Sequence, residues 1–496
     1  MSSPTHLRLA SPNTRRRAPR VVVIGAGLGG LAVALRLQGE GFDVVVLEQR
    51  DAPGGRASQL RADGYTWDTG PSLITMPWVL EEAFAAGGLD LHSEVRMRRL
   101  DPLYRIRWAS DDRHFDFHAD AERLREQVAR FSVRDAANVD GFLAALRPIY
   151  EEGILGAGRR AFGDLRSFAP LLPRMARLGA VVPLHRFVAR WFRHPRVREA
   201  FSFHSLFIGG DPFRVPAIYG ALAYLQVLDG GWYCDGGVYS LVQAMARPLD
   251  VRSATRAVAI ERSRDGVCGV RLADGSRIAA DVVISNADVL RTHELLGVRR
   301  PWRRLRPTMS CFLLYLGLDR VQSSLLHHTL LVGPGYRSFI RDVTRGRRLP
   351  TSFSTYVHAP ARTEPGMAPD GGDSLAVLLP VPNLRADVDW ERAADTLREA
   401  LVADLETRFG LEGLAGSVVV EHRMAPPDFA REFGAVDGNA FAVEPTLHQS
   451  AYFRAPNRVG PGVYHVGAGT HPGAGIPGVL LGAQVTASLV AQDVRR

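Results

Sequence analysis

Three glycines near the start of the chain have the spacing of a phosphate-binding turn. Gly25, Gly27 and Gly30 form the pattern G-x-G-x-x-G, with Gly29 beside the last of them. The first glycine permits a tight turn, the second lets a pyrophosphate approach the backbone, and the third allows a helix to pack on its strand. The free N–H groups and the dipole at the start of that helix favour phosphate. The spacing therefore predicts that this turn binds the pyrophosphate of a dinucleotide.

The elements needed to position this turn lie on both sides of it. A β-branched run at 21–24 is typical of a buried parallel strand, and apolar residues at helical spacing follow over 31–37. A second apolar run, 44–47, ends in Glu48. An acid about 20 residues after the turn accepts hydrogen bonds from the ribose hydroxyls and disfavours a 2′-phosphate. Together these segments predict a complete β-α-β nucleotide-binding unit, for a dinucleotide other than NADP.

The stretch after Glu48 distinguishes between the remaining dinucleotides. Gly54 and Gly55 allow the backbone to approach a ligand, and Arg56 adds a cation near the pyrophosphate. Further on, Asp68, Thr69 and Gly70 form another turn, which we expect near the redox ring. The arrangement of an acid followed by G-G-R resembles the FAD-binding signature of amine oxidases, protoporphyrinogen oxidases and carotenoid desaturases. This resemblance implies FAD as the cofactor.

The C-terminal part of the chain is predicted to close the same site. Residues 462–466 have the composition of a strand, Gly467 and Thr470 lie in the turn that leaves it, and 473–478 repeats G-x-G-x-x-G, ending at Gly478. The remaining residues hold no further strand-helix-strand pattern, so a second nucleotide domain is not expected. We expect a helix from Val479 to residue 490, whose N-terminal dipole stabilises negative charge on the reduced ring. Without a second nucleotide domain, the substrate itself should deliver the electrons.

Composition excludes several other chemistries. All 61 basic residues are arginine, which excludes a lysine Schiff base and a Walker-type phosphate loop. The three cysteines form no C-x-x-C pair, and no HExxH or GxSxG motif occurs, so a dithiol, a metal site and a serine nucleophile are not expected. The net charge of +9 favours a negatively charged partner. Because no nucleic-acid-binding motif accompanies the arginines, we expect an anionic membrane surface and no nucleic acid.

From residue 21 to the C-terminus the chain resembles the bacterial and fungal phytoene desaturases. The resemblance is carried by five blocks, of which the first and last are shared more broadly among flavoproteins: 47–57, 201–213, 285–288, 441–454 and 467–478. It implies an α/β fold, with a Rossmann-like FAD-binding domain of the glutathione-reductase and amine-oxidase type and an inserted α+β domain that binds substrate and associates with the membrane.

The same resemblance implies an activity. Phytoene desaturases dehydrogenate 15-cis-phytoene successively, through phytofluene, ζ-carotene and neurosporene, typically to lycopene. FAD is the cofactor, and oxygen or a membrane quinone would reoxidise it. The alternatives are a desaturase of diapophytoene or hydroxyneurosporene, a carotene isomerase, a flavin amine or porphyrinogen oxidase, and a prenyl-binding chaperone without flavin. The sequence leaves the number of desaturation steps, the electron acceptor and the oligomeric state open.

Dehydrogenation of a polyene needs a hydride acceptor, a place for the departing proton and an apolar channel. Asp164 and His471 are the candidates for handling the proton or contacting substrate, although a helix-capping role is the alternative for Asp164. His204 is interpreted as a buried core histidine. Four apolar segments are candidates for the channel wall: 201–203, 206–208, 219–228 and 309–318.

The chain is predicted to fold into two interleaved domains. The FAD-binding domain is expected over 21–80, 231–295 and 455–496, and the substrate-binding or lid domain over 81–230 and 296–454. Residues 1–20 are predicted to be a disordered basic tail. The basic and apolar stretch 168–201 is predicted to be helical and to lie on anionic lipid. Because no run of about 18 apolar residues occurs, we predict a cytoplasmic protein that associates peripherally with the cell membrane.

Overall fold

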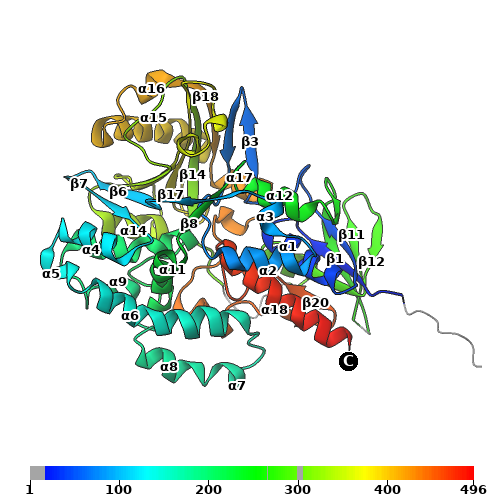
Figure 1. The fold of residues 1–496 in the computed structure, drawn as a ribbon. Helices are drawn as coiled ribbons and strands as arrows, with labels where there is room; N and C mark the ends of the chain where they lie inside the picture. The colour runs from blue at the N-terminus through cyan, green and yellow to red at the C-terminus, as the bar shows by residue number, and fades with distance from the viewer. Residues whose placement is uncertain (1–16, 265, 299–304, 496) are drawn as a thin grey trace, which may run out of the picture.

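The computed structural model describes residues 17–264, 266–298 and 305–495. In Figure 1 the chain forms a nucleotide-binding region around β1 and α1, and a larger region built around a second sheet. Most of the predicted basic tail, residues 1–16, lies outside the described residues. The last residue of that tail, Arg20, already belongs to the first strand.

A six-stranded sheet forms the nucleotide-binding region. Five of its strands are parallel. The central strand β1 is valine-rich because both of its faces are covered: Val21 and Val23 face one core cluster, while Val22 and Ile24 face another. Only β19 runs antiparallel to its neighbour. In spatial order the strands are β19 (Arg458–Gly460), β20 (Val463–His465), β13 (Val282–Ser285), β1 (Arg20–Ile24), β2 (Asp43–Leu47) and β9 (Asp250–Arg252).

Helices cover one face of this sheet and a small sheet covers the other. Helices α1 (Leu28–Gly39) and α18 (Ile476–Val494) pack against each other although they come from opposite ends of the chain (Figure 1). The opposite face is covered by β10 (Ala257–Ser263), β11 (Gly266–Leu272) and β12 (Arg277–Ala279), whose apolar residues join the core of β1 and β2. Residues at the carboxyl ends of β1 and β2, Ile24 and Leu47, line a cavity that also includes residues of the second region.

The second region contains a seven-stranded mixed sheet. Its neighbouring strands are antiparallel except for β15 and β6, which are parallel. The strand β14 is buried along its whole length, so its sequence is almost continuously apolar. In spatial order the strands are β18 (Val418–Met424), β14 (Ser310–Leu318), β17 (Asp373–Val381), β16 (Thr355–His358), β15 (His328–Val332), β6 (Tyr104–Trp108) and β7 (Asp111–Phe117).

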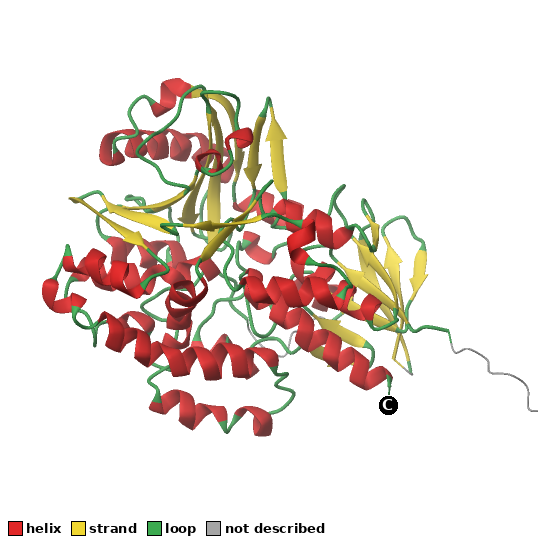
Figure 2. Ribbon diagram, in the orientation of Figure 1, coloured by secondary structure: helices red, strands yellow, loops and turns green. Residues whose placement is uncertain are grey.

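Helices accompany the second sheet on two sides. Figure 2 shows one group at the upper end of this sheet and a larger group beneath it. The upper group is α15 (Trp390–Phe409) with α16 (Leu414–Ser417). The lower group comprises α4 (Ala121–Ala129), α5 (Val133–Ala136), α6 (Val139–Tyr150), α9 (Leu184–Val188), α10 (Pro195–Ser202), α11 (Ala221–Asp229) and α14 (Tyr336–Arg345).

Two β-ribbons connect the regions. The hairpin of β3 (Gln59–Ala62) and β4 (Tyr65–Asp68) carries Trp67, whose indole N–H donates to the carbonyl oxygen of Leu316 at 3.3 Å. Strand β5 (Met97–Leu100) pairs with β8 (Gly231–Cys234), which is 131 or more residues away in sequence yet adjacent in space. The pairing of β5 with β8 cannot be read from local sequence periodicity.

The basic stretch 168–201 is not one continuous helix. It contains α8 (Leu171–Arg177), α9 and α10, and it follows α7 (Leu165–Phe168). Prolines at 170, 183 and 195 lie at the starts of these helices, where proline fits but cannot continue a preceding helix. Helices α7 and α8 lie at the lower edge of the molecule in Figure 1. Within the described residues, no helix combines the length and apolar character needed to cross a bilayer.

Candidate active site

The first glycine turn has the backbone that its spacing predicts. Gly25 adopts a positive φ of 97°, and helix α1 begins directly after Gly27. A Cβ atom on Gly30 would stand 2.0 Å from the carbonyl oxygen of Gly25, so only glycine fits where the helix crosses the turn. Gly27 has no side chain between the helix N-terminus and the adjoining cavity. The turn is therefore open to a phosphate group and offers it unpaired N–H groups.

Glu48 lies beside this turn, at the end of β2. Its carboxylate accepts the backbone N–H of Ala26 at 2.9 Å and that of Arg50 at 3.0 Å. The side chain is buried and forms part of the cavity wall. These two hydrogen bonds hold the carboxylate in one orientation, as expected for an acid that binds the hydroxyls of a ribose.

Asn286 is a site residue to which the sequence analysis gives no role. It follows β13, and its side-chain amide donates to the carbonyl oxygen of Gly25 at 3.3 Å. Its side chain also stands within 3.0 Å of the positions that Cβ atoms on Gly27 and Gly29 would take. The signal that could have identified it is its place at the carboxyl end of the strand next to β1, where ligands bind in parallel sheets.

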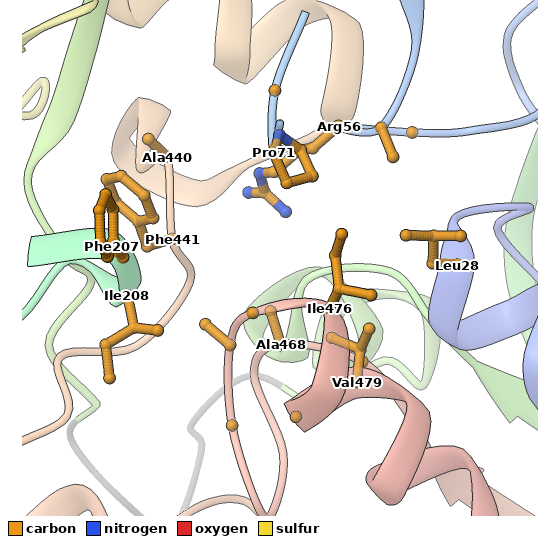
Figure 3. A pocket seen from close by; sticks show the side chains of 18 of the residues that line it. Leu28, Arg56, Pro71, Phe207, Ile208, Ala440, Phe441, Ala468, Ile476 and Val479 are labelled. Carbon is orange, nitrogen blue, oxygen red and sulfur yellow. The ribbon is translucent and has the colours of Figure 1, made fainter. Parts of the chain in front are cut away.

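Arg56, the cation that the sequence predicts near the pyrophosphate, lies on the cavity wall. Its guanidinium donates to the backbone and side-chain oxygens of Asn439 at 3.2 and 3.3 Å, and it lies 5.9 Å from the ring of Phe433. Desolvation lowers the pKa of Arg56, and the nearby Asp288 partly opposes this shift. Its Nε is buried without a hydrogen-bond partner among the residues that the structure describes. Figure 3 shows the guanidinium pointing into the cavity, so a negatively charged ligand there would complete its contacts.

The C-terminal glycine turn forms the opposite wall. Helix α18 begins at Ile476, three residues before the predicted Val479, because Gly475 with a φ of 94° and Pro477 set up its first turn. The cavity wall includes Gly467, Gly478 and Val479. Figure 3 shows Ile476 and Val479 facing Arg56 across the cavity. The N-terminal dipole of α18 is therefore directed at the ligand site, as the sequence indicates.

Most of the predicted cofactor residues line one cavity of about 530 Å³. Three of them do not line it. Gly30 packs beneath the turn, and the hydroxyl of Thr470 donates to the carbonyl oxygen of Ala455 at 2.6 Å. Asp68 instead accepts the N–H of Val238 at 2.8 Å, and burial raises its pKa to about 7. The predicted residues that line the cavity are Gly25, Gly27, Gly29, Glu48, Gly54, Gly55, Arg56, Thr69, Gly70, Gly467, Gly478 and Val479.

The same cavity continues into the second region as an apolar arm. All four predicted channel segments contribute to its wall, through Phe203, Leu206, Phe207, Leu222, Leu225, Met309 and Leu313. Strands β6 and β15 and helix α14, which the sequence analysis does not assign to the wall, complete it with Ile106, Trp108, Leu330, Val332 and Phe339. We call this part of the cavity the apolar arm. Its wall offers a ligand dispersion and burial, with few hydrogen bonds.

Neither candidate for proton transfer lies on the cavity wall. Asp164 is exposed and caps α7 by accepting the N–H of Ser167 at 2.8 Å, and this hydrogen bond lowers the pKa of Asp164. His471 is buried, with Nε2 2.9 Å from the carbonyl oxygen of Ala157. Burial lowers the pKa of His471 to about 4, so the ring is neutral at neutral pH.

The fold and this site define a flavin-dependent oxidoreductase. The chain belongs to the family of flavin-containing amine oxidoreductases, whose model matches residues 28–491. The cyclohexylamine oxidase of Brevibacterium oxydans has the same fold, with a TM-score of 0.60 and 17% identity, over 97% of this chain and 100% of that one. The cofactor is FAD, and the orphaned Arg56 Nε and the bare glycine turn fit its pyrophosphate.

Curated relatives place the chain more closely, among the phytoene desaturases. It is 39% identical to the lycopene-forming phytoene desaturase of Pseudescherichia vulneris, over 96% of this chain and all of that protein. It is 35% identical to the neurosporene-forming phytoene desaturase of Cereibacter sphaeroides, over 97% of this chain and 96% of that protein. The family resemblance and the fold class predicted from the sequence are thereby confirmed.

Proposed function

We propose that this protein is an FAD-dependent phytoene desaturase that converts 15-cis-phytoene to lycopene by successive dehydrogenations. The observation that carries the proposal is the continuity of one cavity from the dinucleotide turns to the apolar arm. A linear hydrocarbon can be bound along such an arm by burial of its surface alone. The similarity to lycopene-forming relatives supports lycopene as the product. Because other relatives form neurosporene, the identity of the product is what the experiment must test.

Each double bond requires that two hydrogens leave the substrate as a hydride and a proton. Bound FAD supplies the acceptor for the hydride. The chain's part is to hold one carbon–carbon bond at the turns formed by Thr69 and Gly70 and by residues 473–479, and to exclude water from it. The N-terminus of α18 favours negative charge at this position. Asp164 and His471 remain the candidates that the sequence offers for the departing proton, and oxygen or a membrane quinone is the proposed final electron acceptor.

An amine oxidase is the alternative that the shared fold suggests. An amine is charged at neutral pH, and the arm would have to desolvate that charge among phenylalanine and leucine side chains. The wall of the apolar arm therefore favours a hydrocarbon. A carotene isomerase would use the same arm, and only net oxidation of the substrate separates it from a desaturase.

We also propose that the lower edge of the molecule contacts the membrane. Leu165 and Leu172 are exposed on α7 and α8, and Phe453 is exposed on an adjacent short helix. The rings of Phe168 and Tyr452 stack at 5.8 Å and connect these elements. Arg166, Arg174 and Arg177 are exposed among them. An apolar edge flanked by arginines suits an anionic lipid surface, from which phytoene would enter.

The experiment that tests the function is pigment analysis of a bacterial host that accumulates phytoene and expresses this chain. Lycopene, identified by retention time and absorbance spectrum, is the expected product. Accumulation of neurosporene or ζ-carotene would retain the desaturase and correct the number of steps. Unchanged phytoene alongside purified, FAD-loaded protein would overturn the proposal. A Glu48→Ala variant in the same host serves as the flavin-deficient control.

A further inference from the structure

Three buried histidines cluster behind the wall of the cavity. His328 on β15 and His358 on β16 are directly paired across the two strands, and His327 precedes His328. All three side chains are at least nine-tenths buried. One nitrogen from each ring lies within 4.8 Å of the others. Polar clusters of this size are costly in a protein interior unless their nitrogens are satisfied.

The nitrogens of the cluster are divided into an inner and an outer set. The Nε2 atoms of His327 and His358 lie 3.2 Å apart. The outer nitrogens of two rings face oxygen atoms, because His327 Nδ1 lies 2.6 Å from the hydroxyl of Thr363 and His328 Nδ1 lies 2.6 Å from the hydroxyl of Tyr356. The Nε2 of His328 is buried and has no hydrogen-bond partner among the described residues.

The two inner Nε2 atoms are close enough to share a hydrogen bond, and two features of the cluster also match a metal site. Nitrogens bound at about 2.0–2.1 Å to one tetrahedral ion lie about 3.3 Å apart, which agrees with the separation of the two inner Nε2 atoms. Histidine ligands characteristically hydrogen-bond an oxygen through their other nitrogen, as His327 and His328 do here.

We propose that His327, His328 and His358 bind one divalent transition-metal ion of the zinc type. Imidazole nitrogens suit Zn²⁺, and three such ligands leave a fourth position for water. The ring of Tyr233 lies 4.7 Å from the ring of His327, and the hydroxyl of Tyr233 donates to the carboxylate of Glu364 at 2.7 Å. The negative charge of Glu364 is therefore separated from the proposed cation by one side chain.

The ion would act on the cavity through Tyr356. The hydroxyl of Tyr356 lies 2.6 Å from His328 and 2.7 Å from the hydroxyl of Ser72, and both Tyr356 and Ser72 line the cavity. With Nε2 on the metal, His328 must donate its Nδ1–H to Tyr356, whose own proton then points to Ser72. The proposed metal therefore has a structural role: it fixes the direction of the hydrogen bond from Tyr356 to Ser72 at the cavity wall. It is not required to take part in electron transfer.

The test is metal binding by the FAD-loaded protein purified with a histidine-free tag. After exposure to Zn²⁺ and passage over a desalting column, we expect about one Zn²⁺ per chain by mass spectrometry. With Co²⁺ in its place, we expect the visible bands of tetrahedral cobalt, at wavelengths beyond the flavin absorption. His358→Gln and His328→Gln should each weaken binding at least tenfold. Less than a tenth of an equivalent and no cobalt bands in the wild type would overturn the proposal.

Two controls separate this site from other histidines and from misfolding. His204→Gln changes another buried histidine outside the cluster, and His92→Gln changes an exposed one, so both should bind the ion as the wild type does. Unchanged binding in His358→Gln and His328→Gln would place the ion elsewhere and refute the proposal. If these variants fail to fold, X-ray absorption at the zinc edge of the wild type decides, since it distinguishes three imidazole ligands from oxygen or sulfur ligands. Neither readout depends on desaturase activity.

Discussion

The carboxylate of Glu48 accepts the backbone N–H of Ala26 at 2.9 Å, which ties the acid at the end of β2 to the glycine turn at the end of β1. This contact holds the two halves of the dinucleotide site in register before any ligand binds. The groups that the sequence predicts to bind phosphate and ribose are therefore preorganised, so less ordering would be needed when FAD binds.

Glu48→Gln should weaken FAD binding while leaving the fold intact. A hydrogen bond to a charged group contributes about 1.5–3 kcal/mol, so we expect the Kd for FAD to rise roughly 10- to 100-fold. Quenching of flavin fluorescence during titration of the apoprotein measures this change. Asp43→Asn, at the exposed start of the same strand, is the matched control and should leave the Kd unchanged. Equal Kd values for FAD in the wild type and Glu48→Gln would show that Glu48 does not bind the ribose.

Gly30→Ala should disrupt the first glycine turn. An added Cβ would meet the carbonyl oxygen of Gly25 at 2.0 Å and the side chain of Asn286 at 3.2 Å, so the turn or the helix would have to shift. We expect the free energy of unfolding to fall by about 1–3 kcal/mol. We also expect the purified variant to retain little flavin. Thermal unfolding and the ratio of flavin to protein absorbance measure both effects. Gly163→Ala, where nothing lies within 4 Å, should behave like the wild type.

The nucleotide site could be predicted from the sequence because it is built from short segments with local signals. The strand at 21–24, the turn and Glu48 lie within one β-α-β unit, so their spacing alone determines their geometry. Asp68 is a residue whose position the local sequence does not predict. Its motif places it beside the ligand, but the chain folds so that its carboxylate accepts the N–H of Val238, far away in sequence.

The rest of the cavity depends on long-range pairing that no local pattern encodes. The arm is completed by β6 and β15, which are parallel neighbours more than 200 residues apart. The basic stretch 168–201 has helical composition throughout, but its prolines divide it into short helices. The histidine cluster likewise forms only when β15 and β16 pair, so His328 and His358 carry no recognisable spacing in the sequence.

Val332→Trp should shorten the apolar arm and reduce the number of desaturation steps. Val332 lines the arm on β15 and pairs with Trp108 of β6. In Figure 1, β6 lies on the side of the molecule away from β1. A larger ring there would stop a long polyene from sliding inward for its later oxidations. In the phytoene-accumulating host, we expect pigments to shift from lycopene toward ζ-carotene and neurosporene. Val321→Trp, on the surface, should leave the products unchanged. An unaltered lycopene fraction in Val332→Trp would show that this arm does not hold the polyene.

Buried neutral histidines should make the protein less stable in acid. Burial lowers the pKa of His204 to about 3, whereas the unfolded chain titrates near 6.5. The unfolded state therefore binds the proton first, and the stability lost between pH 6.5 and 5 is about 2 kcal/mol for this residue. His185, His465 and His471 act in the same direction, and Asp68, with its raised pKa, opposes them.

The measurement is thermal unfolding at pH 7.5 and pH 5. The wild type should lose stability on acidification, and His204→Gln should show a smaller difference between the two pH values, whatever its stability at pH 7.5. An identical difference in both proteins would mean that His204 is protonated in the folded state at pH 5.

Asp164→Asn separates the two roles open to Asp164. Asparagine caps a helix about as well as aspartate but cannot accept the departing proton, so the substitution removes only the acid–base function. Because Asp164 is exposed, lies outside the cavity wall and already accepts the N–H of Ser167, we expect the variant to keep the wild-type turnover within about twofold. Asp164→Ala removes the cap as well and should lower the midpoint of thermal unfolding relative to Asp164→Asn. A loss of turnover of 100-fold or more in Asp164→Asn, with unchanged flavin content and thermal stability, would instead identify Asp164 as the proton acceptor, because general acid–base catalysis contributes about 10²–10⁴-fold.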